Sequence, residues 1–566
     1  MFRKNTVQQL NLDDPTINLP KYLRKNLEKS WATPFNKYIF SNINEERFEV
    51  LYSDEVSRPN SPVNVLVGLL ILKENFSLPD EDLIGSLNFD MRFQFALGTT
   101  SYQKQPVSIN TLYNFRTRIL EYEKKTGRDL IKEEIEALAA LIETEMKLDG
   151  KMLRMDSMMI SSSCKKLSRI ELVYTVNLKL IKELNKIDPK LVPEDLKCYL
   201  DEGHKNETIY RTRDKDAATK LEWLLGHSIL LREVCSKYDT QIVECEAFKL
   251  LKRLLEEQVE VNEEGKTVPK DGKSLHSEIL QNPSDPDATY REKYSGNVGY
   301  VANLVESFNE DSGVITHYDF KPNTYSDIKF CEDLIDTLGE VSEVNVLVDG
   351  AYYSYEMDEK AKKQGIMLKP GQLVGKAPAQ DKLSYSSFEV DEGTQKITLC
   401  PNKEVPQISY SSKNSYTAKF KDEQCDKCPL RNQCPAKKEK KGYSVKFSSK
   451  RYSNSKVREK LQTKEYIKLT NKRAGVEGIP SVIRRKYKVD AMPVRGLLRS
   501  KIMFSFKIGA YNFNKLLRYL KKKGILNATS LLNNYIYTFI GKIIELTENV
   551  NKSNNFTTLK MLVFGV

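Results

Sequence analysis

Two acidic residues interrupt apolar, strand-forming segments of this 566-residue chain. Asp349 ends the run NVLVDG, and Asp156 lies inside the run MLRMDSMMI. A carboxylate in such a place must be solvated, paired or metal-bound, because burying a bare charge is expensive. Two local alternatives apply, since Asp-Gly is a common turn and an aspartate in a strand often lies on a solvent-facing edge. If the two strands are neighbours, however, their carboxylates repel each other unless a divalent cation neutralises them.

Carboxylates paired in this way have a specific chemistry. Hard oxygen ligands select Mg²⁺ or Mn²⁺, and two such ions about 4 Å apart activate a water or a 3′-hydroxyl in phosphodiester transfer. Such a site needs a third carboxylate, for which Glu477 is the best candidate. Arg473 stands four residues before it and Arg484 seven after it, so a continuous helix would place all three on one face. A surface salt bridge within the helix is the alternative explanation for Arg473 and Glu477.

The elements that would position these acids follow an α/β order. Residues 151–160 are predicted to be extended, and a hairpin follows with its turn at residues 311–313. A capped helix, the strand before Asp349, a short helix and the strand IMLKP come next. This is the order of an RNase H-like mixed sheet flanked by helices. Asp156 would lie on its first strand and Asp349 at the end of its fourth, which are neighbours in that sheet; the core strands are expected in residues 146–163 and 286–370.

Helical segments precede and interrupt this sheet. Residues 1–145 are predicted to form an all-α domain, and residues 164–285 a mainly helical insertion. In the segment SINTLYNFRTR of the first domain, Asn110, Asn114 and Arg118 look outward from an apolar stripe. Short polar donors and arginines on one face are typical of a DNA recognition helix. An ordinary bundle helix with a solvated face fits the pattern equally well.

Four of the nine cysteines form a group in the sequence. An odd number of cysteines scattered through the chain argues against a disulfide framework and favours metal binding or buried thiols. The group consists of Cys400, Cys425, Cys428 and Cys434. Four thiolates are enough for a closed tetrahedral zinc site, although the spacing differs from two CxxC knuckles, and a cluster of ordinary thiols is the alternative. We expect a structural Zn²⁺ in a cysteine-containing insertion at residues 371–450.

The positive charge of the chain is concentrated near its C-terminal end. The net charge is +12, yet residues 436–524 hold 27 lysines and arginines against five acids, so the remainder is net acidic. A one-sided excess of this size indicates a polyanion site, and nucleic acid is favoured over an acidic membrane because no clean basic amphipathic helix occurs there. Four residues of this region are candidates to hold phosphates: Arg473, Arg484, Arg485 and Lys486. Residues 451–524 would complete the catalytic core, with residues 525–566 as a C-terminal tail.

Targeting signals are not expected in this chain. No run of about 18 uncharged apolar residues occurs, and the start lacks an apolar segment before a small-residue cleavage site. We therefore expect a cytoplasmic protein with no membrane partner.

Taken together, the motifs resemble those of the DDE transposases of bacterial insertion sequences. MLRMDSMMI, NVLVDGAYYS and RAGVEG occur in that order, preceded by SINTLYNFRTR and interrupted by CDKCPLRNQCP. The resemblance is to the branch with a cysteine-containing insertion before the glutamate, and it spans roughly residues 20–520. It implies that Asp156, Asp349 and Glu477 hold two Mg²⁺ or Mn²⁺ ions.

The same resemblance implies an activity and its partners. A transposase cleaves and joins the ends of its element, so the expected partners are double-stranded terminal repeats and target DNA, bound by a homodimer at the bacterial nucleoid. The family signature around the glutamate has a tyrosine, an arginine, the glutamate and a lysine; Arg473 and Glu477 match it. Thr470 and Arg484 replace the other two, and Pro480 is expected to break the helix. A transposase-derived DNA-binding protein without catalysis, or a metal-dependent nuclease that cannot join strands, is the alternative.

Overall fold

The chain divides into two compact units. The computed structural model describes residues 1–5, 14–16, 18–53, 55, 59–100, 107–210, 216–238, 240–292, 296–375, 381–391, 393–412 and 414–524, so the expected C-terminal tail at 525–566 lies outside the described residues. Unit 1 holds residues 1–146 and the chain from 508 onward, and unit 2 holds residues 147–507. Among the described helices, none is long and apolar enough to cross a membrane.

Unit 1 is built from helices, as predicted. They are α1 (Lys21–Glu28), α2 (Ala32–Tyr38), α3 (Val63–Phe76), α4 (Asp80–Phe89), α5 (Met91–Leu97), α6 (Ile109–Thr126) and α7 (Leu130–Glu145), joined by the part of α19 (Leu497–Lys522) from Ile508 onward. Helix α3 is apolar on nearly all sides and almost wholly buried, which is typical of a central helix. The expected extent of the catalytic core, to residue 524, stays a prediction; within unit 1, the ring of Phe513 in α19 meets that of Phe35 edge-on at 5.0 Å.

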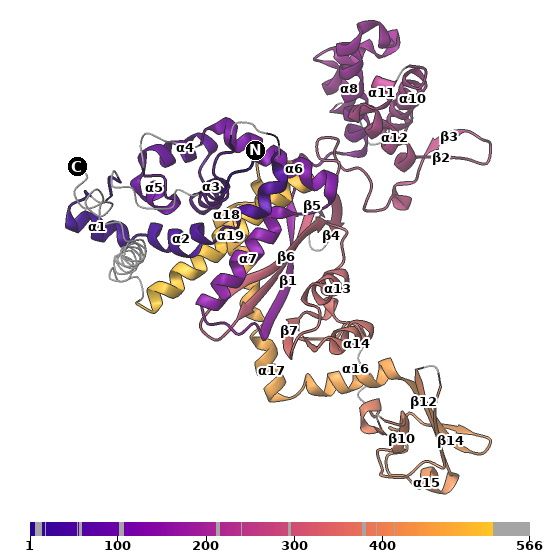
Figure 1. Cartoon of the computed structure of the whole chain (residues 1–566). Coiled ribbons are helices and arrows are strands. Elements are labelled where there is room, and N and C mark those ends of the chain that lie inside the picture. Colours follow the sequence, from indigo (N-terminus) through magenta and orange to yellow (C-terminus); the bar gives the residue numbers. More distant parts are fainter. Residues whose placement is uncertain are drawn as a thin grey trace. The chain divides into compact units, whose positions relative to one another are not determined.

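Unit 2 is organised around one mixed sheet (Figure 1). Its strands are β1 (Met152–Ser161), β4 (Thr289–Glu292), β5 (Gly296–Phe308), β6 (Gly313–Pro322), β7 (Val344–Val348) and β8 (Ile366–Pro370). Strand β5 pairs antiparallel with both β1 and β6, β7 runs parallel to β1, and β8 runs parallel to β7. The order β6-β5-β1-β7-β8 confirms the predicted RNase H-like sheet.

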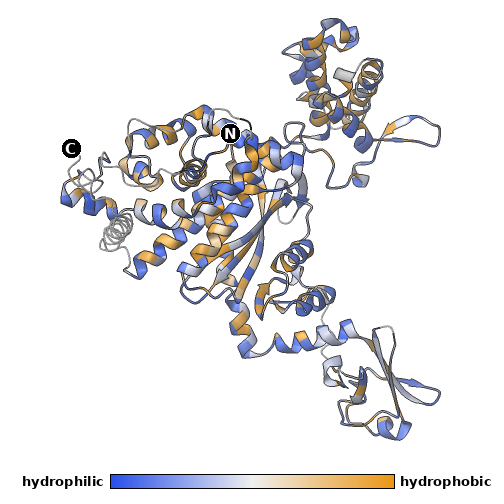
Figure 2. Cartoon of the chain, in the orientation of Figure 1, coloured by the Kyte–Doolittle hydropathy of each residue, from blue (hydrophilic) through white to orange (hydrophobic). Residues whose placement is uncertain are grey.

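The two faces of β1 have different neighbours, because successive side chains of a strand point to opposite sides. Leu153 and Met155 join the apolar core formed with α13 (Asp327–Leu338) and α14 (Tyr355–Lys363). The opposite face meets the helical segments α17 (Lys464–Asn471) and α18 (Ala474–Tyr487), which follow α16 (Ser449–Lys460). Figure 2 shows hydrophobic residues along the strands of this sheet.

A helical insertion with its own core separates β1 from β5. It consists of α8 (Arg169–Ile187), α9 (His204–Ile209), α10 (Ala217–Cys235), α11 (Thr240–Val243), α12 (Glu246–Gln258) and the hairpin of β2 (Val259–Val261) and β3 (Thr267–Pro269). The two ends of the insertion are joined: the Asn282 amide donates to the Lys165 carbonyl at 2.7 Å, and Lys179 Nζ to the Pro283 carbonyl at 3.0 Å. The insertion is therefore a folded module, as its helical pattern predicted.

A second insertion contains the four grouped cysteines. It consists of β9 (Glu389–Asp391), β10 (Lys396–Leu399), β11 (Ile408–Ser412), β12 (Ser415–Phe420), α15 (Asp422–Asp426), β13 (Lys437–Glu439) and β14 (Gly442–Ser448). Strands β11, β12, β14 and β13 form a small antiparallel sheet in that order. Strand β14 leads directly into α16, so this insertion stands immediately before the helices that carry Arg473 and Glu477.

Candidate active site

Asp156 and Asp349 lie at matching positions of neighbouring parallel strands. The register pairs Met152 with Asn345 and, two positions on, Arg154 with Leu347. Each aspartate stands two residues beyond this last pair, so extending the same register gives them matching positions, Asp156 within β1 and Asp349 directly after β7. Their strands are neighbours, as the chain order predicted.

Asp349 also begins a turn. Its Oδ1 accepts hydrogen bonds from the Gly350 amide at 2.7 Å and from Gln372 Nε2 at 3.1 Å. A Cβ at Gly350 would come within 2.8 Å of the Gln372 carbonyl oxygen, so this close approach requires a glycine. The turn and the metal-site interpretations are therefore compatible: the turn holds the aspartate at the end of its strand.

Arg473 connects the third acid to the first. Its Nη1 lies 3.0 Å from Glu477 Oε1, and its Nη2 lies 3.4 Å from Asp156 Oδ1. The Arg473 side chain is 15% exposed, whereas that of Glu477 is 60% exposed. The predicted salt bridge between Arg473 and Glu477 is present, yet the same guanidinium reaches β1. Glu477 is thereby linked to Asp156 through a single intervening cation.

Helix α18 continues through Pro480, so the expectation of a break there is wrong. Val476, Ile479, Ile483 and Tyr487 are buried at helical spacing, and this packed stripe maintains the helix where a proline would weaken it. Farther along, Arg484 Nη1 pairs with Asp490 Oδ2 at 2.6 Å, and its Nη2 donates to the Met159 carbonyl. Arg484, expected to hold phosphate, thus attaches the end of α18 to β1.

Several residues around the acids were not identified from the sequence. Arg154, on the same face of β1 as Asp156, pairs with the fully buried Glu306. Tyr352, directly after the Asp349 turn, is buried and donates to Asn303 Oδ1 at 3.0 Å, and its burial raises the pKa of its hydroxyl. The two-residue period of a strand could have identified Arg154. Glu306 and Asn303 carry no local signal, because both are distant from the acids in sequence.

The donor atoms near this point are of the type that a hard divalent cation prefers. Three carboxylates come from β1, the end of β7 and α18, and the guanidinium of Arg473 lies between two of them as a stand-in positive charge. Within the described parts of the chain, no group of three or more His, Cys, Asp or Glu side chains gathers closely enough to hold a metal ion. The carboxylate oxygens are thus of the chemical type that such an ion prefers, but the described side chains do not gather into a metal site, and Arg473 pairs with two of the three acids.

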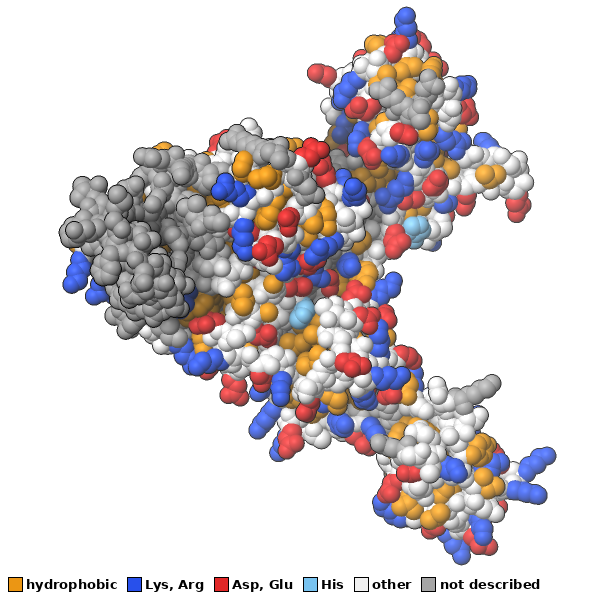
Figure 3. All heavy atoms as spheres, in the orientation of Figure 1, with side chains coloured by type: hydrophobic (Ala, Val, Ile, Leu, Met, Phe, Trp, Pro, Cys, Tyr) orange, Lys and Arg blue, Asp and Glu red, His pale blue; other side chains and the backbone are white. Residues whose placement is uncertain are grey.

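Exposed cations lie on α18 and on the hairpin that ends the cysteine insertion. Arg485 and Lys486 are both exposed on α18. Figure 3 shows Lys and Arg side chains at the tip of the hairpin formed by β13 and β14. That hairpin holds the exposed residues Lys437, Lys438, Lys440 and Lys441. The charge excess seen in the sequence thus lies largely on the surface.

Helix α6 of unit 1 buries the apolar stripe that the sequence predicts. Ser108 caps it, and Leu112, Phe115 and Ile119 are buried. On the remaining surface, Asn110 and Asn114 are exposed, and the guanidinium of Arg118 lies 4.9 Å from the ring centre of Tyr52.

Arg116 differs from its neighbours on α6. It forms two hydrogen bonds with Asp80 of α4, at 2.7 and 2.8 Å, and this contact is the main cause that lowers the pKa of Asp80. Arg116 thus links α6 to α4 within unit 1. The exposed polar surface of α6 centres on the two asparagines and Arg118.

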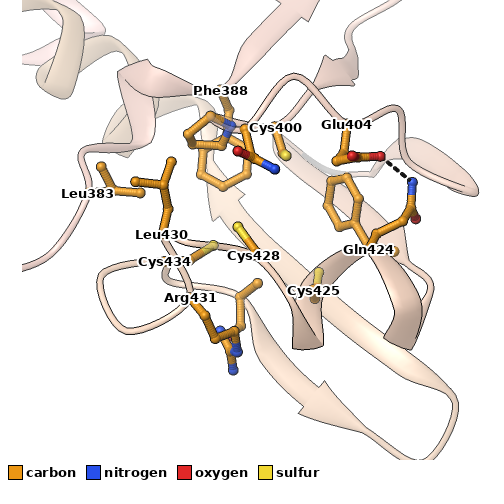
Figure 4. A pocket seen from close by; sticks show the side chains of 14 residues that line it. Leu383, Phe388, Cys400, Glu404, Gln424, Cys425, Cys428, Leu430, Arg431 and Cys434 are labelled. Carbon is orange, nitrogen blue, oxygen red and sulfur yellow. Dashed lines mark hydrogen bonds between the residues drawn. The ribbon is translucent and has the colours of Figure 1, made fainter.

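The four grouped cysteines line one small cavity (Figure 4). They are Cys400, Cys425, Cys428 and Cys434. Burial, followed by the proximity of the other three thiols, raises the pKa of Cys425 to about 11. The sulfur atoms are therefore mutual neighbours, although the described structure gathers no three of them closely enough to hold a metal. Zinc binding stays a prediction.

Comparison with known proteins gives one positive result. Residues 399–517 match the model of the family described as Transposase DDE domain. No curated protein and no solved structure matches the chain significantly. The matched region begins at the end of β10, includes the cysteine group from Cys400 onward, and continues through Glu477 and into α19. This part of the chain is therefore similar to a transposase DDE domain.

Proposed function

We propose that this protein cleaves the ends of a DNA element and joins them to target DNA, with Asp156, Asp349 and Glu477 as its catalytic acids. The observation that carries the proposal is the matched position of the two aspartates on β1 and β7, with Glu477 linked to Asp156 through Arg473. The three carboxylates would hold Mg²⁺ or Mn²⁺. When bound, two such ions would activate a water or 3′-hydroxyl and stabilise the leaving oxygen.

The chain's own residues have distinct tasks in this proposal. Asp349 is oriented by two hydrogen bonds from Gly350 and Gln372, so its carboxylate is held before any ligand arrives. Arg473 pairs with both Asp156 and Glu477, and once these acids bind a metal ion its guanidinium would be available for a DNA phosphate. The exposed Arg485 and Lys486 would hold the phosphate backbone.

A duplex that carries the inverted repeats flanking the gene tests the proposal. The purified protein should cut this duplex at the repeat ends in Mg²⁺ and transfer the ends into a target plasmid. Asp349→Asn should abolish cleavage while DNA affinity is unchanged. The matched control is Asp336→Asn, which changes an exposed aspartate of α13 that pairs with Lys360 and should cut normally. Wild-type cleavage by Asp349→Asn would contradict the assignment, and cutting without transfer would indicate a nuclease.

A second candidate is a transposase-derived protein that binds DNA without cutting it. The observation that favours it is the ion pairing of Arg473, which occupies the space between two of the acids. In this case wild-type protein would bind the repeats but leave them intact in both Mg²⁺ and Mn²⁺.

A further inference from the structure

We propose that Arg154 is a positioning residue that sets the start of α18 on β1 and thereby places Glu477 beside Asp156. This inference rests on the proposed function, because it concerns how one of the three acids is held. Arg154 and Asp156 are two positions apart on β1, so both side chains lie on the face that meets α18.

The guanidinium of Arg154 is fixed on several sides. Its Nε and Nη2 lie 2.7 and 2.6 Å from Glu306 Oε2, and the Glu306 side chain is fully buried. Its plane lies over the ring of Phe308, with 4.3 Å from the guanidinium carbon to the ring centre. A buried carboxylate is costly without a paired cation, so Glu306 holds the Arg154 guanidinium against β5.

The remaining donor of Arg154 reaches the catalytic helix. Its Nη1 donates to the Lys472 carbonyl oxygen at 2.6 Å. Lys472 directly follows α17 as its C-cap, and Arg473 immediately precedes α18. Arg154 therefore connects the sheet to the backbone one residue before the arginine that pairs with both Asp156 and Glu477.

The backbone hydrogen bonds at the start of α18 are irregular. The amide of Val476 bonds to the Arg473 carbonyl at 2.9 Å, three residues back, instead of the Lys472 carbonyl four residues back, and the Gly475 amide approaches Lys472 only at 3.4 Å. A side chain that inserts into the helical hydrogen-bond ladder causes such local tightening and reorients the chain. The Lys472 carbonyl thus takes a donor from β1 in place of a full helical bond, and α18 starts anew after it.

Gly475 shows how close this contact is. A Cβ at this position would lie 2.0 Å from Arg154 Nη1 and 2.6 Å from its Cζ. An arginine end can usually move away, but here Glu306, Phe308 and Lys472 hold it. Gly478, one residue beyond Glu477, has no atom within 4 Å of its Cβ position. Both glycines are exposed in α18 on either side of Glu477, and an added Cβ would meet Arg154 at Gly475 but no atom at Gly478, which makes them a matched pair.

The experiment compares Gly475→Ala with Gly478→Ala in the full chain. At saturating DNA, Gly475→Ala should reduce the cleavage rate by roughly 10- to 100-fold, because a displacement of about 1 Å in a catalytic group has an effect of this size. Its DNA affinity should stay unchanged. Without DNA, its dissociation constant for Mn²⁺, measured by calorimetry, should rise by about tenfold, since a misplaced Glu477 is lost as a ligand. Gly478→Ala should match the wild type in all three measurements.

A double substitution identifies the cause. Arg154→Lys keeps a positive charge for Glu306 and removes the Nη1 atom that an alanine at 475 would strike. In the Arg154→Lys background, Gly475→Ala should therefore alter cleavage and Mn²⁺ binding by less than about twofold. An equal effect of Gly475→Ala in both backgrounds, or equal behaviour of the two alanine variants, would overturn the inference. If the wild type cuts no DNA, the proposed function fails, while the Mn²⁺ comparison still tests the placement of Glu477.

Discussion

Glu134 should make the stability of unit 1 fall as the pH rises from 5 to 8. Its side chain, on α7, is 1% exposed. One carboxylate oxygen accepts from the Asn44 amide at 3.0 Å, and the other lies 3.0 Å from Arg47 Nε. Arg47 is shared with Glu133, at 3.2 Å, so it does not fully compensate the buried charge. Burial dominates and raises the pKa of Glu134 to about 7.

The size of the effect follows from this shift. Below pH 4.5, the ordinary value, the carboxyl is protonated in both the folded and the unfolded chain. Between pH 4.5 and about 7 the unfolded chain loses the proton while the folded unit keeps it, so the free energy of unfolding decreases with pH. Above about pH 7 the loss is complete. A shift of about 2.5 pH units corresponds to about 3 kcal/mol.

Urea unfolding at pH 5, 6, 7 and 8 measures this loss. Trp31 lies in unit 1, against the rings of Phe76 and Phe93, and Trp223→Phe leaves it as the one tryptophan of the chain. All four histidines lie within residues 147–507, so no histidine of unit 1 titrates in this window. In the Trp223→Phe protein, Glu134→Gln should remove the dependence of the free energy of unfolding on pH between pH 5 and 8.

Glu133→Gln is the matched control for this measurement. The contact of Glu133 with Arg128 is the main cause that lowers its pKa, so it titrates below the window. That variant should keep most of the pH dependence between pH 5 and 8, because burial, and not the neighbouring Glu133, is the main cause of the raised pKa of Glu134. A Glu134→Gln protein that still loses about 3 kcal/mol over this range would refute the reasoning.

Two further predictions concern zinc and DNA. Cys428→Ser should release zinc from the purified protein and lower its melting temperature, with Cys331→Ser, a buried thiol of the main core, as the control that lowers stability but leaves the zinc content unchanged. Wild-type protein without zinc by elemental analysis would identify the group as ordinary thiols. Arg485→Ala combined with Lys486→Ala should weaken binding to every duplex and reduce the slope of log K against log salt by about 0.9 per lost contact. Asn114→Ala should weaken repeat binding alone, and an equal loss on random DNA would contradict base reading by α6.

Local sequence patterns predicted most of the architecture. Alternating apolar residues and the order of the elements predicted the sheet, and that order alone placed the strands of Asp156 and Asp349 side by side. The four-residue spacing predicted the contact of Arg473 with Glu477. These features depend on periods of two and of 3.6 residues, which a single sequence displays.

Contacts between distant segments could not be predicted in this way. Arg154 and Glu306 are 152 positions apart, and neither belongs to a recognisable motif. Helix α19 is one continuous helix, and only its packing, with Phe513 against Phe35, assigns its second half to unit 1. Pro480 does not break α18, because burial of the apolar stripe stabilises the helix by more than the low helix propensity of proline destabilises it.

The joined ends of the helical insertion bear on how quickly the central sheet forms. Strands β1 and β5 pair from Ser161 opposite Gly299, about 140 positions apart, and such distant pairing is slow because a long loop must close first. If the insertion folds early, the contacts of Lys165 with Asn282 and of Lys179 with Pro283 leave only about 20 free residues to close. By the logarithmic dependence of closure entropy on loop length, this shortening is worth about 2 kcal/mol. The folded insertion would then hold the ends of β1 and β5 near each other. Replacing it with a short linker should preserve the folding rate of the sheet, whereas substitutions that unfold the insertion should lower that rate.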